Sequence, residues 1–348
     1  MTSLSEAAVG RSGREVLGWG RELVDPALRS AVDSLPPSMR HIAGYHLGWW
    51  DERGVAGGDG SGKAFRPALA LLAAGAVGAD PAAAVPAAVG VELVHNFSLL
   101  HDDVMDGDTT RRHRPTAWAV FGSSAAILAG DALLSLATDV LAASGHARAQ
   151  EGVRALGATV LSLVDGQSAD VEFERRQDVG LSECLTMVGS KTGSLLGCAC
   201  SLGALFGGAS PSRVGELRAF GEQLGLAFQH TDDLLGIWGD PAVTGKPAYS
   251  DLRTRKKSRP VLAALHSGTS AGAELAASYR WEQDPQSTER ELERLAGLVE
   301  EAGGRTWCRD QSAELLEQAL RHLRAAEPAE RPGAELVALA RMATHRDR

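Results

Sequence analysis

Apolar residues recur along most of this chain at spacings of three and four positions. This is the spacing expected for α-helices that bury one face. It extends over nine segments: 67–78, 86–107, 123–144, 150–173, 181–206, 211–237, 258–266, 287–302 and 305–325. No stretch alternates regularly between apolar and polar residues, and no Asn-Gly pair marks a hairpin, so strands are not expected. The pattern predicts an all-α fold.

The breaks between these segments are short runs rich in glycine and proline, at 78–81, 207–211 and 239–241. Such residues end helices and form tight connections. Three longer polar or glycine-rich stretches, 54–62, 239–257 and 268–288, are predicted to be loops. Apolar helices continue on both sides of each loop, so none of them separates independent cores. We therefore predict a single-domain antiparallel bundle of roughly ten or more helices.

Charge and composition narrow the function classes. The 348 residues include 35 lysines and arginines against 44 aspartates and glutamates, which gives a formal net charge of -9. A general nucleic-acid-binding protein needs a basic surface, so this balance argues against one. The basic run 253–259 does not change that conclusion, because no aromatic residues for base stacking are interleaved with it.

The cysteines and the N-terminal residues bear on the cellular compartment. The four cysteines show no metal-binding spacing, so we expect reduced thiols: Cys184, Cys198, Cys200 and Cys308. Charged side chains are spread through the first thirty residues, which is not the pattern of a signal peptide. No run approaches 18 uninterrupted apolar residues, so no membrane span is expected. These features predict a cytoplasmic protein.

An acidic cluster ends the apolar segment 89–100. In the sequence Asp102-Asp103-Val104-Met105-Asp106, a helix places Asp102 and Asp106 on one face and Asp103 to one side. Like charges so spaced repel each other, and the helix macrodipole also disfavours anions at a C-terminus. A hard divalent cation such as Mg2+, which prefers carboxylate oxygens, would stabilise this arrangement. The alternative is a solvated acidic helix end.

A second acidic pair, Asp232-Asp233, ends the apolar segment 220–228, with Gln229 one turn earlier. Taken alone, this pair is typical of an ordinary capped helix end. Two helices that are apolar up to an acidic tip, packed side by side, would bring both acidic groups to the mouth of one apolar cavity. Metal ions bridging that mouth could bind a diphosphate whose hydrocarbon tail lies between the helices.

Basic residues accompany both acidic clusters. Arg111 and Arg112 follow the first one, and Lys63 and Arg66 open a core helix, where the N-terminal dipole favours a phosphate. Lys246 and the run 253–259 follow the second cluster. Lys191 and Thr192 lie among glycines within a helical segment, which predicts a bend or an interruption. Each basic element alone is typical of a solvated face, but together they favour an anion site.

These ordered motifs resemble those of the trans-polyprenyl (isoprenyl) diphosphate synthases, from about residue 40 to the C-terminus. Asp102-Asp103-x-x-Asp106, followed by Arg111-Arg112, is similar to the first aspartate-rich motif, and Gln229-x-x-Asp232-Asp233 to the second. Gly62-Lys63…Arg66-Pro67 with His95 resembles the isopentenyl diphosphate site. The central Gly166-Gln167…Asp170 element and Lys191-Thr192 also match. Lys246 and Lys256, the latter aligned on Asp251, resemble two diphosphate-binding lysines.

The resemblance implies a bundle around a deep central cavity, in a short-chain synthase that forms a homodimer. Residues 41–348 would form the synthase domain, with residues 1–40 as a helical extension packed on the same core. Three Mg2+ ions would bridge the allylic diphosphate to Asp102, Asp106 and Asp232. The remaining charge of this diphosphate would be neutralised by Arg111, Lys191, Lys246 and Lys256.

The resemblance also implies the reaction, a head-to-tail condensation of isopentenyl diphosphate with a dimethylallyl, geranyl or farnesyl diphosphate. The C–O bond of the allylic diphosphate would ionise in a water-poor cavity. The catalytic residues facing the cation would be Lys191 and Thr192, through their carbonyl groups, and Gln229. Isopentenyl diphosphate would be held by Lys63, Arg66, His95 and Arg112. The departing diphosphate would remove the final proton.

The chain departs from the family pattern at two positions: Gly236 stands where many members have a third aspartate, and Ser61 replaces a common glycine. The residues just before the first motif form the floor of the tail cavity in this family. Phe97 is large and Ser98 is small, which resembles enzymes with C20 or C15 products. We expect geranylgeranyl diphosphate first and farnesyl diphosphate second. The alternative is that Phe97 is an ordinary core residue.

Two other functions remain to be separated from a synthase. A class I terpene cyclase shares the first motif but needs an Asn-x-x-x-Ser/Thr-x-x-x-Glu metal motif, and the sole asparagine of this chain, Asn96, precedes the first cluster. The second alternative is a non-catalytic subunit that binds prenyl diphosphate and modulates another synthase. Gly236 is the feature that favours this alternative.

Overall fold

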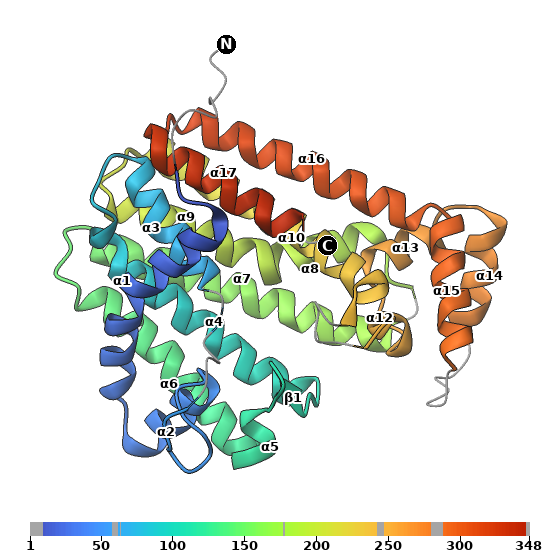
Figure 1. Cartoon of the computed structure of the whole chain (residues 1–348), viewed down its shortest axis with the longest axis horizontal. Helices are drawn as coiled ribbons and strands as arrows, with labels where there is room; N and C mark the ends of the chain where they lie inside the picture. The colour runs from blue at the N-terminus through green and yellow to red at the C-terminus, as the bar shows by residue number, and fades with distance from the viewer. Residues whose placement is uncertain are drawn as a thin grey trace. The chain divides into compact units, whose positions relative to one another are not determined.

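The computed structural model describes residues 10–57, 62, 64–176, 178–241, 247–279 and 288–345 (Figure 1). Lys63 and Lys246 of the predicted site, and Ser61, lie outside these ranges. The longer helices are α1 (Gly13–Asp33), α2 (Pro37–His46), α3 (Phe65–Ala76), α4 (Val85–Met105), α6 (Ser123–Ala142), α7 (Ala149–Arg175), α8 (Leu181–Val188), α9 (Ser194–Phe206), α10 (Pro211–Trp238), α14 (Ser270–Tyr279), α15 (Glu289–Glu301), α16 (Gly304–Ala325) and α17 (Glu330–Thr344).

The shorter elements are η1 (Pro81–Ala84), α5 (Ala117–Phe121), η2 (Gly189–Gly193), α12 (Ser250–Arg253), α13 (Arg259–Leu265) and the strands β1 (Thr110–Arg111) and β2 (Arg114–Pro115). The chain divides into two compact units. Unit 1 contains Met1–Leu161, Leu195–Gly221 and Leu320–Leu339, and unit 2 contains Ser162–Ser194, Glu222–Ala319 and Ala340–Arg348. The predicted all-α fold class is confirmed.

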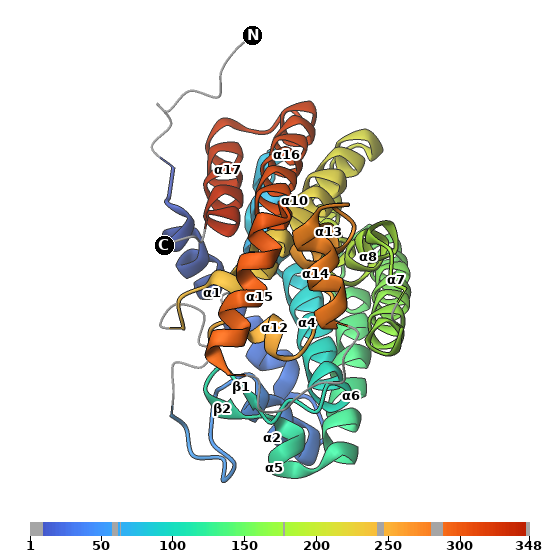
Figure 2. The same cartoon turned by 90° about the vertical axis from the view of Figure 1, so that its right-hand side faces the viewer.

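Unit 1 is built around α4, which lies beside α6 (Figure 2). Helix α3 also packs against α4, and α1 covers α3 and α4. Residues 67–76 of α3 are all buried, which suits a run of alanine and leucine without a polar face. Small residues let the helices approach closely. Gly20 of α1 faces Ala68 of α3, and a Cβ atom on Gly20 would lie 3.3 Å from the Ala68 Cβ. The N-terminal helix α1 therefore packs directly on this core.

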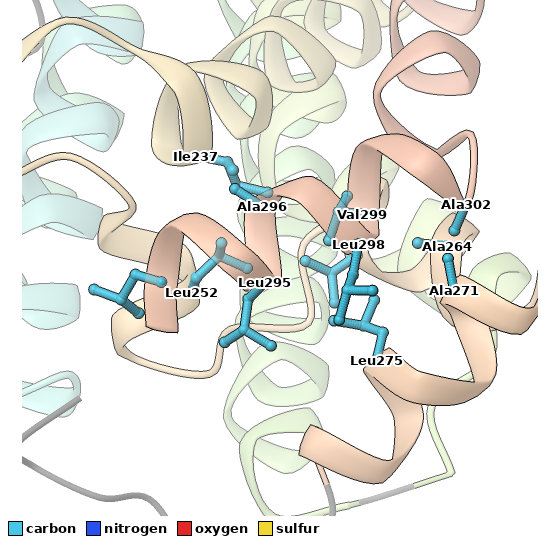
Figure 3. Packing of buried hydrophobic residues seen from close by; sticks show 12 residues of the cluster. Ile237, Leu252, Ala264, Ala271, Leu275, Leu295, Ala296, Leu298, Val299 and Ala302 are labelled. Atoms are coloured by element: carbon cyan, nitrogen blue, oxygen red, sulfur yellow. The ribbon is translucent and has the colours of Figure 1, made fainter. Parts of the chain in front are cut away.

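The core of unit 2 combines the end of α10 with α12, α13, α14 and α15 (Figure 3). Leu292, Leu295 and Val299 of α15 point from one helix face into this cluster, whereas the opposite face is rich in charged residues. Thr288 and Glu291 form a capping box at the start of α15, which satisfies backbone N–H groups of its first turn. Sequence periodicity and capping thus agree on this helix.

Helix α14 lies inside the stretch 268–288 that the sequence predicted to be a loop, so that prediction is wrong for Ser270–Tyr279. The side chain of Thr269 accepts a hydrogen bond from the backbone N–H of Gly272 at 3.0 Å and so caps the first turn. Ala271 and Leu275, four residues apart, bury one side of the helix in the core of unit 2. The helix has only ten residues, and its buried face is too short to give a clear helical pattern in the sequence.

The expectation of no strands is also wrong at one place, where β1 and β2 form an antiparallel ribbon of two residues each. The turn between them consists of Arg112 and His113, whose φ angles are 51° and 61°. Two consecutive positive φ angles match the twist of a tight hairpin, which usually requires asparagine or glycine. Strained residues of this kind cluster at functional sites.

Two helical stretches, 81–105 and α6, are long enough and apolar enough to cross a membrane. Most of the first is buried within the structure, as is usual for a core helix, whereas α6 leaves more of its surface exposed. All four cysteines are buried and free of disulfide bonds, as predicted.

Candidate active site

The first acidic motif lies at the C-terminus of α4 in unit 1. Asp103 is 1% exposed, accepts a hydrogen bond of 2.7 Å from Nε of Arg111 and forms an ion pair with Nη2 of the same guanidinium at 2.6 Å. Burial raises the pKa of Asp103, against the opposing effect of Arg111. Asp102 is partly exposed and Asp106 is exposed. The motif is therefore divided as the helical spacing predicted, with Asp103 turned into the fold and the other two carboxylates on the outer side.

The predicted isopentenyl diphosphate residues that the structure describes share one neighbourhood in unit 1. A Cβ atom on Gly62 would lie 2.9 Å from Nη2 of Arg112, so this glycine lets the guanidinium rest against the backbone. Burial lowers the pKa of His95 well below its usual value, and the positive charges of Arg66 and Arg112 lower it further. The imidazole is therefore neutral at pH 7 while both guanidinium groups remain charged.

Sequence reasoning missed two members of this neighbourhood, Glu92 and His46. Glu92 on α4 is 8% exposed and accepts a hydrogen bond of 3.2 Å from Nδ2 of Asn96. Burial raises its pKa, while Arg66 opposes this rise. The sequence did contain a signal for Glu92: a glutamate inside the apolar run 89–100, one turn before Asn96, indicates a buried polar residue. His46 and Arg112 line a pocket of about 20 Å3, large enough for one water molecule.

The environment of His46 predicts a pH-dependent stability. Burial, with Arg112 and Arg111, lowers its pKa to about 3. Between pH 6.5 and 3 the unfolded chain therefore binds a proton at His46 that the folded chain does not, so stability falls as the pH falls below 6.5. We expect His46→Gln to remove about 1 kcal/mol of the stability loss between pH 7.5 and 5.5. Urea unfolding at both pH values measures this; an equal loss in the variant would show that His46 is not the titrating group.

Phe97 lies on the same face of α4 as His101 and is 6% exposed. The two rings meet edge to face, with their centroids 4.7 Å apart. Nε2 of His101 lies 3.0 Å from the carbonyl oxygen of Ile127, and the ring rests against Gly130, both on α6. Ser98 donates a hydrogen bond to the carbonyl of His95 at 2.8 Å. The Phe97 side chain is thus held in place by packing between α4 and α6.

The second acidic motif lies in unit 2 and has the same division as the first. Asp233 is 4% exposed and accepts two hydrogen bonds from Arg259, from its backbone N–H at 2.9 Å and from Nε at 2.8 Å, and Nη2 of Arg259 forms an ion pair with it at 2.6 Å. Burial by itself would raise the pKa of Asp233, but Arg259 and Lys256 outweigh burial and lower it. Asp232 is partly exposed on the other side of α10.

Arg259, which the sequence did not single out, also organises the residue predicted to face the cation. It is 1% exposed, and its Nη2 donates a hydrogen bond of 2.7 Å to the carbonyl of Gln229. The side chain of Gln229 accepts a hydrogen bond from the hydroxyl of Thr192 at 3.2 Å. The structure thus brings Thr192, Gln229 and the second motif together in unit 2.

Lys191 and Thr192 lie in the π-helical turn η2, which confirms the predicted interruption of this helix. Glycines on the neighbouring helices make room for this wider turn: a Cβ atom on Gly166 would lie 2.5 Å from the backbone nitrogen of Lys191. The Lys191 ammonium pairs with Asp170 of α7 at 2.6 Å. Turns of this type are frequent at functional sites.

Lys256 is exposed and carries the charge expected of a diphosphate-binding lysine. Desolvation lowers the pKa of its ammonium, but the carboxylates of Asp233, Asp251 and Asp170 outweigh it and raise the pKa. The neighbouring Lys257 donates a hydrogen bond of 2.8 Å to the carbonyl of Phe173, near the end of α7. Lys256, Arg259 and Lys191 therefore surround the second motif with positive charge inside one unit.

The carboxylates predicted to hold metal ions lie in both units, Asp102 and Asp106 in unit 1 and Asp232 in unit 2. Within the described ranges, no three His, Cys, Asp or Glu side chains are grouped as ligands of a single ion. The donor set fits Mg2+, because this ion takes oxygen ligands and is commonly held by one or two carboxylates together with substrate phosphates.

Comparison with known proteins identifies the family. Residues 58–296 match the model of the polyprenyl synthetase family. The chain is 49% identical to a (2E,6E)-farnesyl diphosphate synthase of Mycobacterium tuberculosis, over 93% of this chain and 91% of that protein. It is 47% identical to a geranylgeranyl diphosphate synthase of the same organism, over 84% and 83% of the two chains.

Solved structures agree. A polyprenyl synthetase from Streptomyces coelicolor A3(2) superposes with a TM-score of 0.91 at 48% identity, over 94% of this chain and 98% of that one. A geranylgeranyl pyrophosphate synthase from Corynebacterium glutamicum, solved with isoprenyl diphosphate and magnesium, gives a TM-score of 0.78 at 26% identity over 96% and 98%. This chain belongs to the polyprenyl synthetase family. It is a prenyltransferase, and the family resemblance derived from its motifs is confirmed.

Proposed function

We propose that this enzyme condenses isopentenyl diphosphate head to tail (1′-4) with an allylic prenyl diphosphate in a Mg2+-dependent reaction, and that its product is all-trans and short. The main structural support is that the two acidic motifs are arranged alike, each with one aspartate buried and the others more exposed. In each, an arginine binds one buried aspartate, Asp103 or Asp233, and leaves the neighbouring carboxylates on the other side. We expect a C20 product first and a C15 product second, because the large Phe97 and the small Ser98 precede the first motif; relatives named for each of these products are 47% and 49% identical to this chain.

Asp102, Asp106 and Asp232 would hold Mg2+, three ions in each active site. Bound Mg2+ neutralises the diphosphate and so makes it a better leaving group. The cationic groups of Arg111, Lys191, Lys246 and Lys256 complete this neutralisation, and the C–O bond breaks with its electron pair on the diphosphate. The carbonyl groups of Lys191 and Thr192 and the side chain of Gln229 then stabilise the allylic cation.

Isopentenyl diphosphate is bound by Lys63, Arg66, His95 and Arg112. Its double bond attacks the cation to form the new C–C bond, and the released diphosphate takes the proton that this step leaves in excess. The neutral imidazole of His95 serves as a hydrogen-bond partner without adding charge, while Arg66 and Arg112 supply the positive charge.

Phe97, with the small Ser98 beside it, sets the product length. We expect Phe97→Ala to extend the product beyond that of the unmodified enzyme, because removing the ring opens space along α4 beside His101. Mass spectrometry of the products from isopentenyl and farnesyl diphosphate measures this. Phe121→Ala is the control, since this ring packs on Tyr45 and should leave product length unchanged. An unchanged product in Phe97→Ala would mean that Phe97 is an ordinary core residue.

We propose that the enzyme acts as a homodimer in the cytoplasm. Helix α6 supports a second copy as the partner, because the large apolar side chains of Ile127 and Leu128, adjacent in sequence, are 40% and 56% exposed on it. Sedimentation at micromolar concentration tests this proposal. A monomer in the unmodified protein would contradict it, and Leu128→Lys should shift a dimer toward monomer.

The proposed reaction is tested with purified protein, radiolabelled isopentenyl diphosphate and each allylic primer, with Mg2+ or with excess chelator. The expected result is an elongated linear diphosphate that requires Mg2+. Binding of prenyl diphosphate without elongation would instead support the non-catalytic subunit that Gly236 left open. A cyclic hydrocarbon made from the primer alone would support a terpene cyclase.

A further inference from the structure

The position that interrupts the second acidic motif is occupied from elsewhere in the chain. Gly236 lies on α10, four residues after Asp232, where a third carboxylate would complete the motif. A Cβ atom on Gly236 would lie 2.5 Å from Oδ2 and 2.6 Å from Oδ1 of Asp251, which is on α12. The carboxylate of Asp251 therefore fills the space in which a side chain at position 236 would begin.

Several contacts hold α12 at this position. The hydroxyl of Ser250 donates a hydrogen bond of 3.1 Å to the carbonyl of Gly236. The backbone N–H of Lys256 donates a hydrogen bond of 2.8 Å to the carbonyl of Asp251. Leu252 is fully buried and anchors the turn in the core of unit 2. Asp251 is itself 9% exposed, so its carboxylate is held within the fold and not displayed on a mobile surface.

The backbone on both sides of this single helical turn is strained. Tyr249 has a φ of 59° and Arg255 a φ of 55°, in the left-handed region that is unfavourable for residues other than glycine. Such strain persists where the surrounding structure demands one geometry. The fold thus accepts two unfavourable residues in order to place α12 against Gly236.

The charge of Asp251 acts on the same groups as the second motif. Asp251, Asp233 and Asp170 all raise the pKa of the Lys256 ammonium. Because Asp233 is already paired with Arg259, it has little remaining capacity to bind a further cation. Asp251 is the carboxylate next to Gly236, the motif position that has no carboxylate of its own.

We infer that Asp251 supplies, from α12, the third carboxylate that the second acidic motif lacks at Gly236, and that it works with Asp232 in binding Mg2+ and diphosphate. This inference rests on the proposed function. Mg2+ keeps several of its water molecules in proteins, so a carboxylate at this position can act on the ion through water. Three carboxylates then serve the second motif, although its own sequence supplies only two of them.

The test follows Mg2+ binding without any turnover. The melting temperature of the protein is measured with inorganic diphosphate as Mg2+ is titrated, which gives the Mg2+ concentration at the midpoint of the shift. We expect Asp251→Asn to raise this midpoint about tenfold or more, as loss of a supporting carboxylate does at other metal sites. Asp240→Asn, the same change at an exposed position just after α10, is the matched control and should leave the midpoint unchanged.

Moving the carboxylate separates a role in binding from a role in folding. Gly236→Asp alone places two carboxylates in one space and should lower the melting temperature. The double variant Gly236→Asp with Asp251→Gly carries the carboxylate on α10 and should recover the unmodified Mg2+ midpoint to within about threefold, on the scale of such metal sites. Recovery is expected even if Asp251→Asn fails to fold.

The possible outcomes are distinct. If the unmodified protein shows neither a Mg2+-dependent shift nor elongation, the proposed function itself is wrong. If the unmodified protein responds but Asp251→Asn has the same midpoint, the inference about Asp251 is wrong, even if that variant is less stable. A double variant that fails to fold, or that keeps a raised midpoint, also overturns the inference.

Discussion

Asp102→Asn is expected to lower kcat by about 10³-fold at saturating substrate and Mg2+, while the melting temperature of the free enzyme stays within a few degrees. The expected size is that of removing one group that stabilises charge in a transition state. Stability should be little affected, because Asp102 is partly exposed and because neutralising it relieves repulsion from the other acidic residues at the end of α4. Incorporation of labelled isopentenyl diphosphate and a thermal scan measure the two effects.

Asp108→Asn is the control for this prediction. Asp108 is exposed, lies two residues beyond the motif and has no part in the proposed chemistry. It should keep kcat within about twofold, because it is an exposed charge whose one effect on the motif is a weak electrostatic influence on Asp103. If Asp102→Asn kept most of its kcat, or if both variants lost activity equally, the assignment of Asp102 as a metal ligand would be wrong.

Arg259→Met is expected to lower the free energy of unfolding by about 3–5 kcal/mol, because it leaves the Asp233 carboxylate buried without its partner. This arginine donates two hydrogen bonds to Asp233 and one to the carbonyl of Gln229, and its Nη2 forms an ion pair with Asp233; of these contacts the variant keeps the backbone N–H bond. Urea unfolding followed by circular dichroism measures the loss.

A second substitution tests the physical reason for this loss. The double variant Arg259→Met with Asp233→Leu removes both charges and should recover much of the stability, since an apolar pair avoids the cost of burying an unpaired ion. A loss below about 1 kcal/mol in Arg259→Met, the value of an exposed pair, would show that this contact contributes little. A double variant no more stable than the single one would point to packing instead.

Helical periodicity predicted many of the long helices, because most of them bury one continuous face, but α1, α2 and α17 lie outside the nine predicted segments. The segment 211–237 corresponds to α10, which ends one residue later, and 123–144 corresponds to α6, which ends two residues earlier. The π-helical turn η2 was also foreseeable, since Lys191 and Thr192 stand between glycines. In each case the information is local: apolar spacing, helix-ending residues and small side chains.

The parts that escaped prediction depend on tertiary contacts. Nothing near Asp233 in sequence reveals that its partner is Arg259, because residues 234–258 separate them. The same holds for Asp251, whose carboxylate meets Gly236 only once α12 has folded back. The two turn positions of the ribbon, Arg112 and His113, hold neither glycine nor asparagine, so their positive φ angles could not be predicted from local preference.

For the site, helix geometry predicted which carboxylate of the first motif would stand apart, and the structure shows Asp103 paired with Arg111. For the second motif, two adjacent aspartates gave no indication of which one would be buried. The presence of Arg259 on the adjoining helix α13 decides this for Asp233. Residue spacing therefore predicts which side chains share a face of one helix. Which of them is buried against a charged partner is known only from the three-dimensional structure.

The central claim is that Asp102 and Asp232 act on one Mg2+-bound diphosphate. It is tested by measuring the affinity for inorganic diphosphate in Mg2+, by calorimetry, for the unmodified protein, Asp102→Asn, Asp232→Asn and the double variant. Residues that share a ligand should be coupled by about 1 kcal/mol or more, so that the double variant loses clearly less or clearly more than the sum of the single losses. Losses that add to within about 0.5 kcal/mol, as for independent sites, would contradict the account.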